Sequence, residues 1–102
     1  MPTVLLIDMI KKRIDYWKDG DSGKFTDGNH FRLARVRAPE KYQFGGEAAT
    51  RRAAGMSGRT RGLVNVRILG RDSYGRSIVE IYNKDGSINN RLLRRGSRNK
   101  GR

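Results

Sequence analysis

The sequence predicts a mainly β fold with added helices, formed by a single domain. The chain has 102 residues, which is enough for one domain and short for two. Segments in which apolar and polar residues alternate lie next to the turn pairs Asp27-Gly28 and Asp85-Gly86, as is typical of paired strands. An alanine-rich segment between them favours a helix. We expect the domain to cover residues 1–96, and residues 97–102, which contain no apolar side chain, to form a basic disordered tail.

The first predicted strand covers about residues 12–18, where apolar and polar side chains alternate. The apolar residues before it also fit a helical spacing, so the structure of residues 3–11 stays open. The turn sequence DGDSG ends this strand. The next two strands, residues 24–26 and 31–36, flank Asp27-Gly28, and we expect them to pair as a hairpin.

A helix is predicted over residues 47–56, after a loop that contains Pro39 and the glycines of KYQFGG. The helical segment EAATRRAAGM is rich in residues of high helix propensity. Glycines stop helices readily because they adopt backbone conformations that other residues avoid. We therefore expect the helix to end at Gly55 and Gly58.

Two more strands and a short helix complete the predicted order. LVNVRIL, residues 63–69, is predicted to be a strand with one buried face, made by Val64, Val66 and Ile68. SIVEIYN, residues 77–83, follows the turn RDSYGR and has the same pattern. Ser87 can cap a last helix, INNRLLRR, which ends before Gly96.

Five short strands, with one helix inserted after the third and a short C-terminal helix, fit a barrel of the oligonucleotide-binding type (OB fold). Such barrels often present a basic groove and aromatic side chains to nucleic acid. The composition agrees, since 23 Lys and Arg against 10 Asp and Glu give a net charge of +13. The basic residues are spread along the chain with aromatic residues between them, and they do not gather on one amphipathic face. Nucleic acid is therefore a better partner than a membrane surface.

Two further features limit the possible functions. The chain has no cysteine, which excludes a zinc finger and thiol chemistry. The apolar run at residues 4–7 is interrupted by Asp8 and follows no basic residue, unlike a signal peptide, so we expect an intracellular protein. The run is too short to cross a membrane. It is expected to cover apolar surface of the barrel or to pair two subunits, so the protein would be a monomer or a homodimer.

Five segments resemble, in their order and spacing, the staphylococcal nuclease (thermonuclease-like) family. They are DGDS after the first strand, FRLARVRAPE, the Gly-Glu-Ala start of the helix, RDSYGRSIVE and DGSINNRLLRRG. The similarity extends over about residues 14–96. It implies a nuclease that hydrolyses phosphodiester bonds of DNA or RNA.

The resemblance implies three catalytic side chains. Glu40 would take a proton from the attacking water, as a general base must. Arg32 and Arg76 would bind the phosphate oxygens, on which negative charge accumulates in the transition state. Each residue also has a simpler interpretation: Glu40 as a turn carboxylate, Arg32 as a solvated strand residue, and Arg76 as a partner of Asp72.

Further contacts with nucleic acid are expected from Arg35, Arg37, Lys41 and Tyr74, of which Tyr74 resembles a family tyrosine that contacts the bound nucleotide. Tyr16, Trp17, Phe44 and Tyr74 could stack on bases without regard to base identity, but for Trp17 and Phe44 we expect core positions instead. Strict alternation along FRLARVRAPE would turn Arg35 and Arg37 to the core side, together with Phe31. The strand is therefore expected to end or bulge near Ala34.

The sequence departs from the family at the calcium site. In calcium-dependent members the ion is held by the second aspartate of the Asp-Gly-Asp turn, which is Asp21 here, and by an aspartate and a threonine at the positions of Arg37 and Ala38. One carboxylate beside an arginine is a poor site for Ca²⁺. Three outcomes stay open: Arg37 replaces the metal, Asp21 with support from Asp19 holds hydrated Ca²⁺ or Mg²⁺, or the domain only binds nucleic acid and is catalytically inactive.

Overall fold

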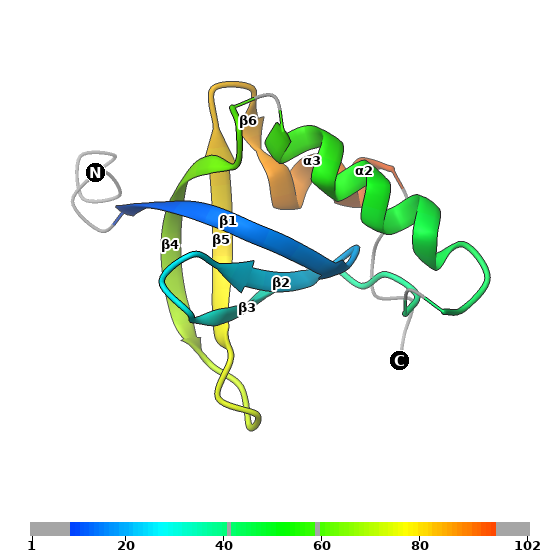
Figure 1. The fold of residues 1–102 in the computed structure, drawn as a ribbon, viewed down its shortest axis with the longest axis horizontal. Coiled ribbons are helices and arrows are strands. Elements are labelled where there is room, and N and C mark those ends of the chain that lie inside the picture. Colours follow the sequence, from blue (N-terminus) through cyan, green and yellow to red (C-terminus); the bar gives the residue numbers. More distant parts are fainter. Residues whose placement is uncertain (1–8, 41, 59, 96–102) are drawn as a thin grey trace.

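A mixed β-sheet that closes on itself forms the body of the protein (Figure 1). The structure is a computed structural model, which describes residues 9–40, 42–58 and 60–95. The strands are β1 (Met9–Asp19), β2 (Ser22–Phe25), β3 (His30–Leu33), β4 (Leu63–Arg71), β5 (Ser77–Asn83) and the two-residue β6 (Gly86–Ser87). The helices are α2 (Gly46–Gly58) and α3 (Ile88–Arg94). The predicted barrel with one helix after the third strand is confirmed, while β6 was not predicted.

A parallel pairing between β3 and β5 closes the barrel. The strands follow the order β3-β2-β1-β4-β5-β6, and β3 also pairs with β5, so that Phe31 lies opposite Ser77 and Arg32 opposite Ile78. The other pairings are antiparallel. Because Arg76 immediately precedes Ser77, the closure brings it close to the strand that carries Arg32.

The predicted hairpin is confirmed, but its second strand is shorter than expected. Strands β2 and β3 pair antiparallel around Asp27-Gly28. Strand β3 ends at Leu33, whereas the prediction extended to residue 36. Ala34 and Arg35 form a turn, and Arg35 has φ 67°. The expected interruption near Ala34 is therefore confirmed, and it turns the Arg35 side chain out of the core.

The barrel core is built on aromatic contacts. Phe25 and Phe31 are buried and stack with ring centroids 4.5 Å apart, and Trp17 meets Phe31 edge to face at 5.2 Å. Trp17 is partly buried against this core and donates its indole N–H to Ser57 Oγ at 3.0 Å. The prediction of a packing role for Trp17 is confirmed.

Two predicted core positions are wrong. The Phe44 side chain is fully exposed, because it lies in the loop before α2 and packs against no other described element. Ile68 is 43% exposed, although Val64 and Val66 on the same strand are buried. The pairing of β4 with β5 shifts register between Ile68 and Gly70, which breaks the alternation that the sequence suggested.

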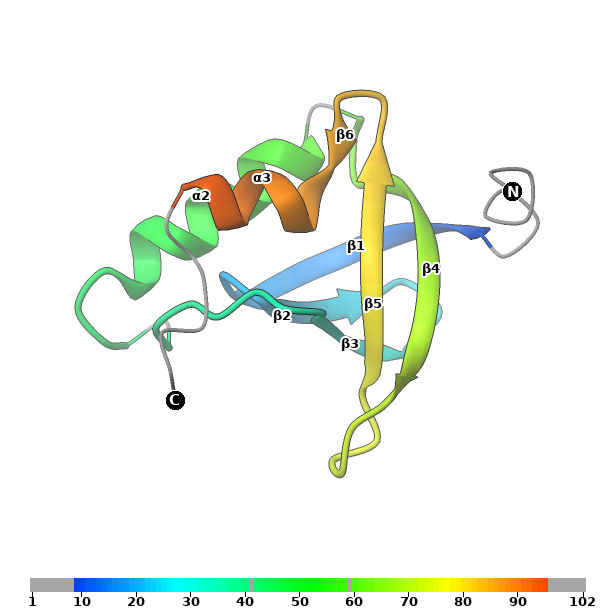
Figure 2. The same cartoon turned by 180° about the vertical axis from the view of Figure 1, so that it is seen from behind.

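The two helices lie together at one end of the barrel (Figures 1 and 2). Helix α2 buries Ala49, Ala53 and Met56, in agreement with the predicted helix. Helix α3 begins as predicted at Ser87, whose Oγ accepts the N–H of Asn90 at 3.1 Å. No helix in the described ranges is long and apolar enough to cross a membrane. The apolar run at residues 4–7 and the tail at residues 97–102 lie outside the described residues.

Candidate active site

Carboxylates and arginines from distant parts of the chain meet at one end of the barrel. Asp19 is the last residue of β1, and Asp21 lies in the tight turn that leads to β2. Arg32 lies in the middle of β3, and Glu40 lies in the segment that leaves β3 for α2. Arg76 immediately precedes β5. The charges of Asp19, Arg32 and Arg76 all affect the pKa of Asp21, so these side chains share one site.

Asp21 connects the turn to the segment that carries Glu40. Its Oδ2 accepts the backbone N–H of Ala38 at 3.3 Å and lies 3.9 Å from Nη2 of Arg32. Burial raises the pKa of Asp21 above its usual value, and the Ala38 hydrogen bond and the charge of Arg32 oppose this effect only in part. Asp21 therefore already has partners on the protein.

Glu40 is exposed, and the nearby carboxylate of Asp19 has the largest effect on its pKa. The negative charge of Asp19 is the main reason that the pKa of Glu40 is raised, with smaller effects from burial and from Asp21. The carboxyl groups of Glu40 and Asp19 are close enough to form a hydrogen bond when one of them is protonated. A carboxylate with a raised pKa is a stronger base than an ordinary glutamate.

The backbone around Glu40 is held by Gln43. The Glu40 N–H donates to Oε1 of Gln43 at 2.8 Å, and the Gln43 N–H donates to the Glu40 carbonyl at 2.8 Å. Sequence analysis did not single out Gln43, since a glutamine in a loop gives no distinctive pattern. The pair fixes the start of the loop that leads to α2.

Arg32 and Arg76 are partly buried, and each has a partner that restricts its position. Arg32 donates from Nη1 to the Leu33 carbonyl at 3.0 Å. Arg76 donates from Nε to Oδ2 of Asp72 at 2.7 Å, and its guanidinium lies 5.5 Å from the ring centre of Tyr74. This geometry agrees both with a catalytic role of Arg76 and with its simpler interpretation as a partner of Asp72.

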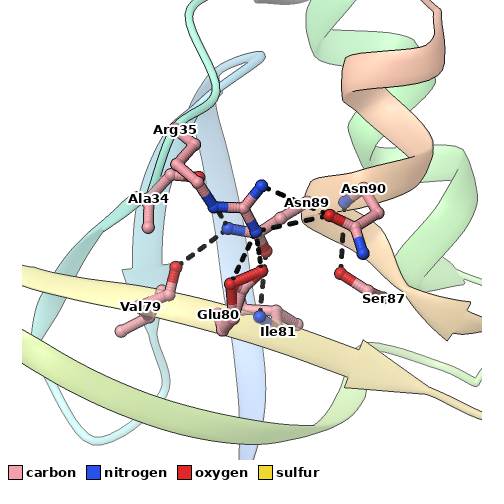
Figure 3. Close-up of polar contacts among 8 residues, drawn as sticks. All are labelled: Ala34, Arg35, Val79, Glu80, Ile81, Ser87, Asn89 and Asn90. Atoms are coloured by element: carbon pink, nitrogen blue, oxygen red, sulfur yellow. Dashed lines mark hydrogen bonds and ion pairs between the residues drawn. The ribbon is translucent and has the colours of Figure 1, made fainter.

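Arg35 makes its contacts within the protein (Figure 3). Its Nη2 donates to both carboxylate oxygens of Glu80, and Nη1 and Nη2 each lie 3.3 Å from Oδ1 of Asn90. Glu80 is buried, while the Arg35 side chain is 52% exposed. Arg35 thus neutralises a buried carboxylate on β5 and joins the turn after β3 to α3.

The buried amide of Asn89 strengthens this junction (Figure 3). Its Nδ2 donates to the carbonyl oxygens of Ala34 and Val79, both at 3.0 Å, and its Oδ1 accepts the N–H of Ile81 at 2.9 Å. Asn89 therefore ties α3 to β5 and to the turn after β3. The segment that leads to Glu40 starts from this turn.

The remaining predicted contacts with nucleic acid differ in their surroundings. Tyr74 is 84% exposed in the turn between β4 and β5. Arg37 is half-buried, and no hydrogen bond or ion pair links it to another of the described residues. In particular, Asp21 has Arg32 and Ala38 as neighbours and is not paired with Arg37. Lys41 lies outside the described residues.

The donor set does not fit a calcium ion in the geometry known for the family. Among residues 9–40, 42–58 and 60–95, no group of three or more His, Asp or Glu side chains is arranged to hold a metal ion. Asp21 accepts a hydrogen bond from Ala38 and lies near the positive charge of Arg32, which disfavours a cation beside it. Asp19 is also engaged, since Ser22 Oγ donates to its Oδ2 at 3.4 Å.

Gly20 allows the site to pack closely, although sequence analysis treated it only as part of a turn. A Cβ atom on Gly20 would lie 2.8 Å from the Cβ atoms of both Ala38 and Ala49. A glycine between Asp19 and Asp21 therefore lets the turn approach both the Glu40 segment and α2. The Asp-Gly-Asp sequence is the signal that could have indicated this close approach.

Comparison with models of known protein families identifies the family of the chain. Residues 30–99 match a family model described as staphylococcal nuclease homologue. The match extends over more than half of the chain and includes Arg32, Glu40 and Arg76. A search of curated proteins found no match.

Proposed function

The chain belongs to the staphylococcal nuclease family, and from this premise we propose that it hydrolyses phosphodiester bonds of DNA or RNA. The observation that carries the proposal is the arrangement at this end of the barrel, where Oδ2 of Asp21 lies 3.9 Å from Nη2 of Arg32 and accepts the N–H of Ala38 at 3.3 Å, in the segment that carries Glu40. The negative charge of Asp19 raises the pKa of Glu40 at this site. A raised pKa suits a general base, and the arginines suit a phosphate. These features are consistent with hydrolysis at this end of the barrel.

In the proposed reaction, Glu40 takes a proton from a water molecule as its oxygen attacks phosphorus. The new P–O bond forms while the ester P–O bond breaks, and the leaving oxygen takes a proton from solvent. Glu40 is exposed, so water can reach its carboxylate. Such a base typically contributes about 10²-fold to 10⁴-fold to the rate.

Arg32 and Arg76 would bind the non-bridging oxygens, where negative charge increases in the transition state. Asp72 holds Nε of Arg76, so the terminal nitrogens of that guanidinium are left to face a phosphate. A planar guanidinium can donate two hydrogen bonds to one phosphate group, which lysine cannot do in the same fixed geometry. No step of this proposal passes through a metal ion.

A binding-only function is the second candidate, and one observation favours it. The described carboxylates are not arranged to hold a metal ion. In that case the arginines and lysines would neutralise phosphates without turnover. Binding would then weaken steeply with salt concentration, as expected when counterions are released from nucleic acid.

A comparison of Glu40→Gln with Glu47→Gln tests the proposal. Both changes remove one exposed carboxylate, but Glu47 lies in the first turn of α2 and pairs with Arg51 at 3.8 Å. Purified proteins are incubated with single-stranded and duplex DNA and RNA in EDTA, Ca²⁺ or Mg²⁺. We expect Glu40→Gln to lose about 10²-fold or more in rate and Glu47→Gln to keep the activity of the parent.

Two outcomes would contradict the nuclease proposal. If Glu40→Gln degrades the substrates as fast as the parent, Glu40 is not the general base. If the parent degrades none of the substrates in any condition but binds them in a salt-dependent manner, the binding-only function is correct. Activity that EDTA abolishes and Mg²⁺ or Ca²⁺ restores would show that the mechanism requires a metal ion.

A further inference from the structure

Three basic side chains lie on the outer face of the barrel, where β1 pairs with β4 (Figure 1). On β4 the buried Val64 and Val66 point into the core, so Arg67 points outward, because side chains alternate across a strand. On β1, Lys11 pairs with the residue between the two valines and Arg13 pairs with the residue before them, so both point outward as well. Lys11, Arg13 and Arg67 form what we call the outer basic cluster.

The carboxylate opposite Arg67 is already bound to another arginine. Glu80 lies opposite Arg67 on β5, but it is buried and accepts hydrogen bonds from Arg35 (Figure 3). Lys11 and Arg67 are diagonal neighbours on the two paired strands, at a Cα separation of about 7–8 Å. Among residues 9–40, 42–58 and 60–95, no hydrogen bond or ion pair joins either side chain to another residue. Two neighbouring positive charges therefore have no bound counter-charge in the part of the chain that the structure describes.

Arg13 is held in place and keeps its positive charge. Its Nη1 donates to the Arg61 carbonyl at 2.7 Å, and a carbonyl oxygen carries no net charge that could neutralise a guanidinium. Asp15 lies two residues further along β1, and its Oδ2 is 3.7 Å from Nζ of Lys24. The outer basic cluster is therefore a positively charged surface, which attracts anions.

A hollow with a volume of about 350 Å³ opens beside the outer basic cluster. Its lining combines basic and apolar side chains, among them Lys11, Arg13, Ile10 and Leu63. Lys12 also lines the hollow, but its charge is bound to Asp27. Ligand sites in proteins are usually concave, because a concave surface makes more contacts than a flat one. The shape of this region therefore favours a ligand, and its charge favours an anion.

The outer basic cluster is distant from the candidate active site. Strand β1 carries Lys11 near its start and Asp19 at its end, so these residues lie about 25 Å apart at a rise of about 3.3 Å per residue. One phosphate group cannot contact both places. A duplex presents a phosphate about every 3.4 Å along each strand, so about 8 base pairs are needed to span this distance. Only a long nucleic acid can bind at both places at once.

We propose that the outer basic cluster is a second phosphate-binding surface, which holds the backbone of a long DNA or RNA molecule outside the candidate active site. The inference rests on the proposed function, because the polyanion that reaches Glu40 is then also available to the cluster. Lysine and arginine bind phosphates without reading bases, so the surface adds affinity for length and not for sequence. Two linked sites bind one long ligand more tightly than either site alone.

The double variant Lys11→Gln/Arg67→Gln tests the proposal, because neither side chain has a described partner whose loss would disturb the fold. The control is Lys84→Gln/Arg94→Gln, which removes the same charge from exposed positions in the turn after β5 and in the last turn of α3. All proteins carry Glu40→Gln, so that the ligands stay intact. The ligands are a duplex of about 30 base pairs and a hairpin with a stem of about 6 base pairs. Fluorescence anisotropy measures their binding over a range of salt concentrations.

We expect the double variant in the cluster to bind the long duplex about 10-fold more weakly at low salt. The slope of log K against log salt concentration should decrease by about 2, since two phosphate contacts are lost. Binding of the short hairpin should change by less than about 2-fold, because the hairpin cannot bridge the two sites. The control variant should bind both ligands like the reference protein. Thermal unfolding should show the same midpoint for all three proteins.

Three results would overturn the proposal. If the double variant binds the long duplex with the affinity and salt slope of the reference protein, the cluster does not contact phosphates. If the control variant loses as much affinity, only the net charge of the protein matters. If the double variant keeps its binding to DNA and loses binding to vesicles of anionic lipid, the surface serves a membrane.

Failure of the nuclease proposal would look different from failure of this inference. A protein with Glu40 intact would then bind the long duplex and cleave none of the substrates, while Lys11→Gln/Arg67→Gln would still weaken that binding. The second phosphate-binding surface would stand in that case, as part of a protein that only binds nucleic acid.

Discussion

Asp72 holds Arg76 through both its backbone and its side chain. Oδ1 of Asp72 accepts the Arg76 backbone N–H at 2.9 Å, and Oδ2 accepts Nε at 2.7 Å. Burial acts to raise the pKa of Asp72, but the hydrogen bonds from Arg76 and Tyr74 outweigh it and lower the pKa below its usual value. The carboxylate therefore stays ionised and orients the guanidinium that we assign to phosphate binding.

Replacing Asp72 should lower activity without removing any group that contacts substrate. In Asp72→Ala the Arg76 side chain is free to adopt other rotamers, so we expect kcat to fall by about 10-fold or more. Asp27→Ala is the matched control, since Asp27 pairs with Lys12 in the turn between β2 and β3. Steady-state kinetics would give kcat for Asp72→Ala and for Asp27→Ala. Equal activity of both variants would show that Arg76 needs no support from Asp72.

The pH dependence of activity should follow the charge of Asp19. Glu40 must be deprotonated to act as a base, so activity falls as the pH falls through its raised pKa. Asp19→Asn removes the negative charge that contributes most to this raised pKa. The pKa of Glu40 should then decrease, and the acidic limb of kcat/KM should move to lower pH.

Asp15→Asn provides the control for this experiment. Asp15 is an exposed carboxylate on β1 that lies 3.7 Å from Lys24, and it is not among the groups that shift the pKa of Glu40 most. We expect the acidic limb of kcat/KM in Asp15→Asn to match that of the parent. A limb that stays in place in Asp19→Asn, or moves to higher pH, would show that Glu40 does not act as the titrating base.

Arg35 combines an unfavourable backbone conformation with a favourable ion pair, and two substitutions separate these effects. Arg35→Ala leaves Glu80 buried without its partner and keeps a side chain at φ 67°, so the free energy of unfolding should fall by about 2–4 kcal/mol. Arg35→Gly also loses the pair but relieves the backbone, so its loss should be smaller by about 1 kcal/mol. Urea unfolding measures both values.

Adding Glu80→Gln to each Arg35 variant isolates the ion pair. A neutral amide at this position needs no cation, so we expect part of the lost stability to return. If Arg35→Ala is as stable as the parent, the pair contributes nothing measurable. If Arg35→Gly and Arg35→Ala unfold at the same urea concentration, the left-handed conformation of Arg35 carries no cost.

Gly20 should not tolerate a side chain, in contrast to Gly55. In Gly20→Ala the new methyl group would lie 2.8 Å from Ala38 and from Ala49, so the turn must move away from the Glu40 segment. We expect a loss of about 1–3 kcal/mol in stability and a lower kcat. Gly55 lies inside α2 with no atom within 4 Å of an added Cβ. Gly55→Ala should stabilise the protein by about 1 kcal/mol.

Thermal unfolding and kinetics of these two variants check the prediction together. A stable and fully active Gly20→Ala variant would show that the turn can move without disturbing the site. A loss of stability in Gly55→Ala would show that α2 packs differently at this position.

The elements that could be predicted from sequence are those with local signals. The hairpin around Asp27-Gly28 and the capping of α3 by Ser87 depend on residues that are close in the chain. The end of β3 was predictable as well, because two arginines cannot face an apolar core. Phe44 was misjudged, since an aromatic residue in a loop has no periodicity that reveals its burial.

The contacts that support the candidate site could not be predicted in the same way. Arg35 and Glu80 are separated by 45 residues, and nothing in either segment marks the other as its partner. Glu40 and the arginines were identified by resemblance to a family, while the link between Glu40 and Asp19 depends on how the barrel closes. Their catalytic roles stay predictions that the variants above would test.

The parallel pairing that closes the barrel between β3 and β5 affects the order in which the parts of the protein fold. Its partners, such as Phe31 and Ser77, are far apart in sequence, so this pairing has a high entropic cost during folding. The hairpins can form earlier from local contacts. Arg32 and Arg76 approach each other only when the closure forms, so a site that needs both arginines would be assembled late in folding.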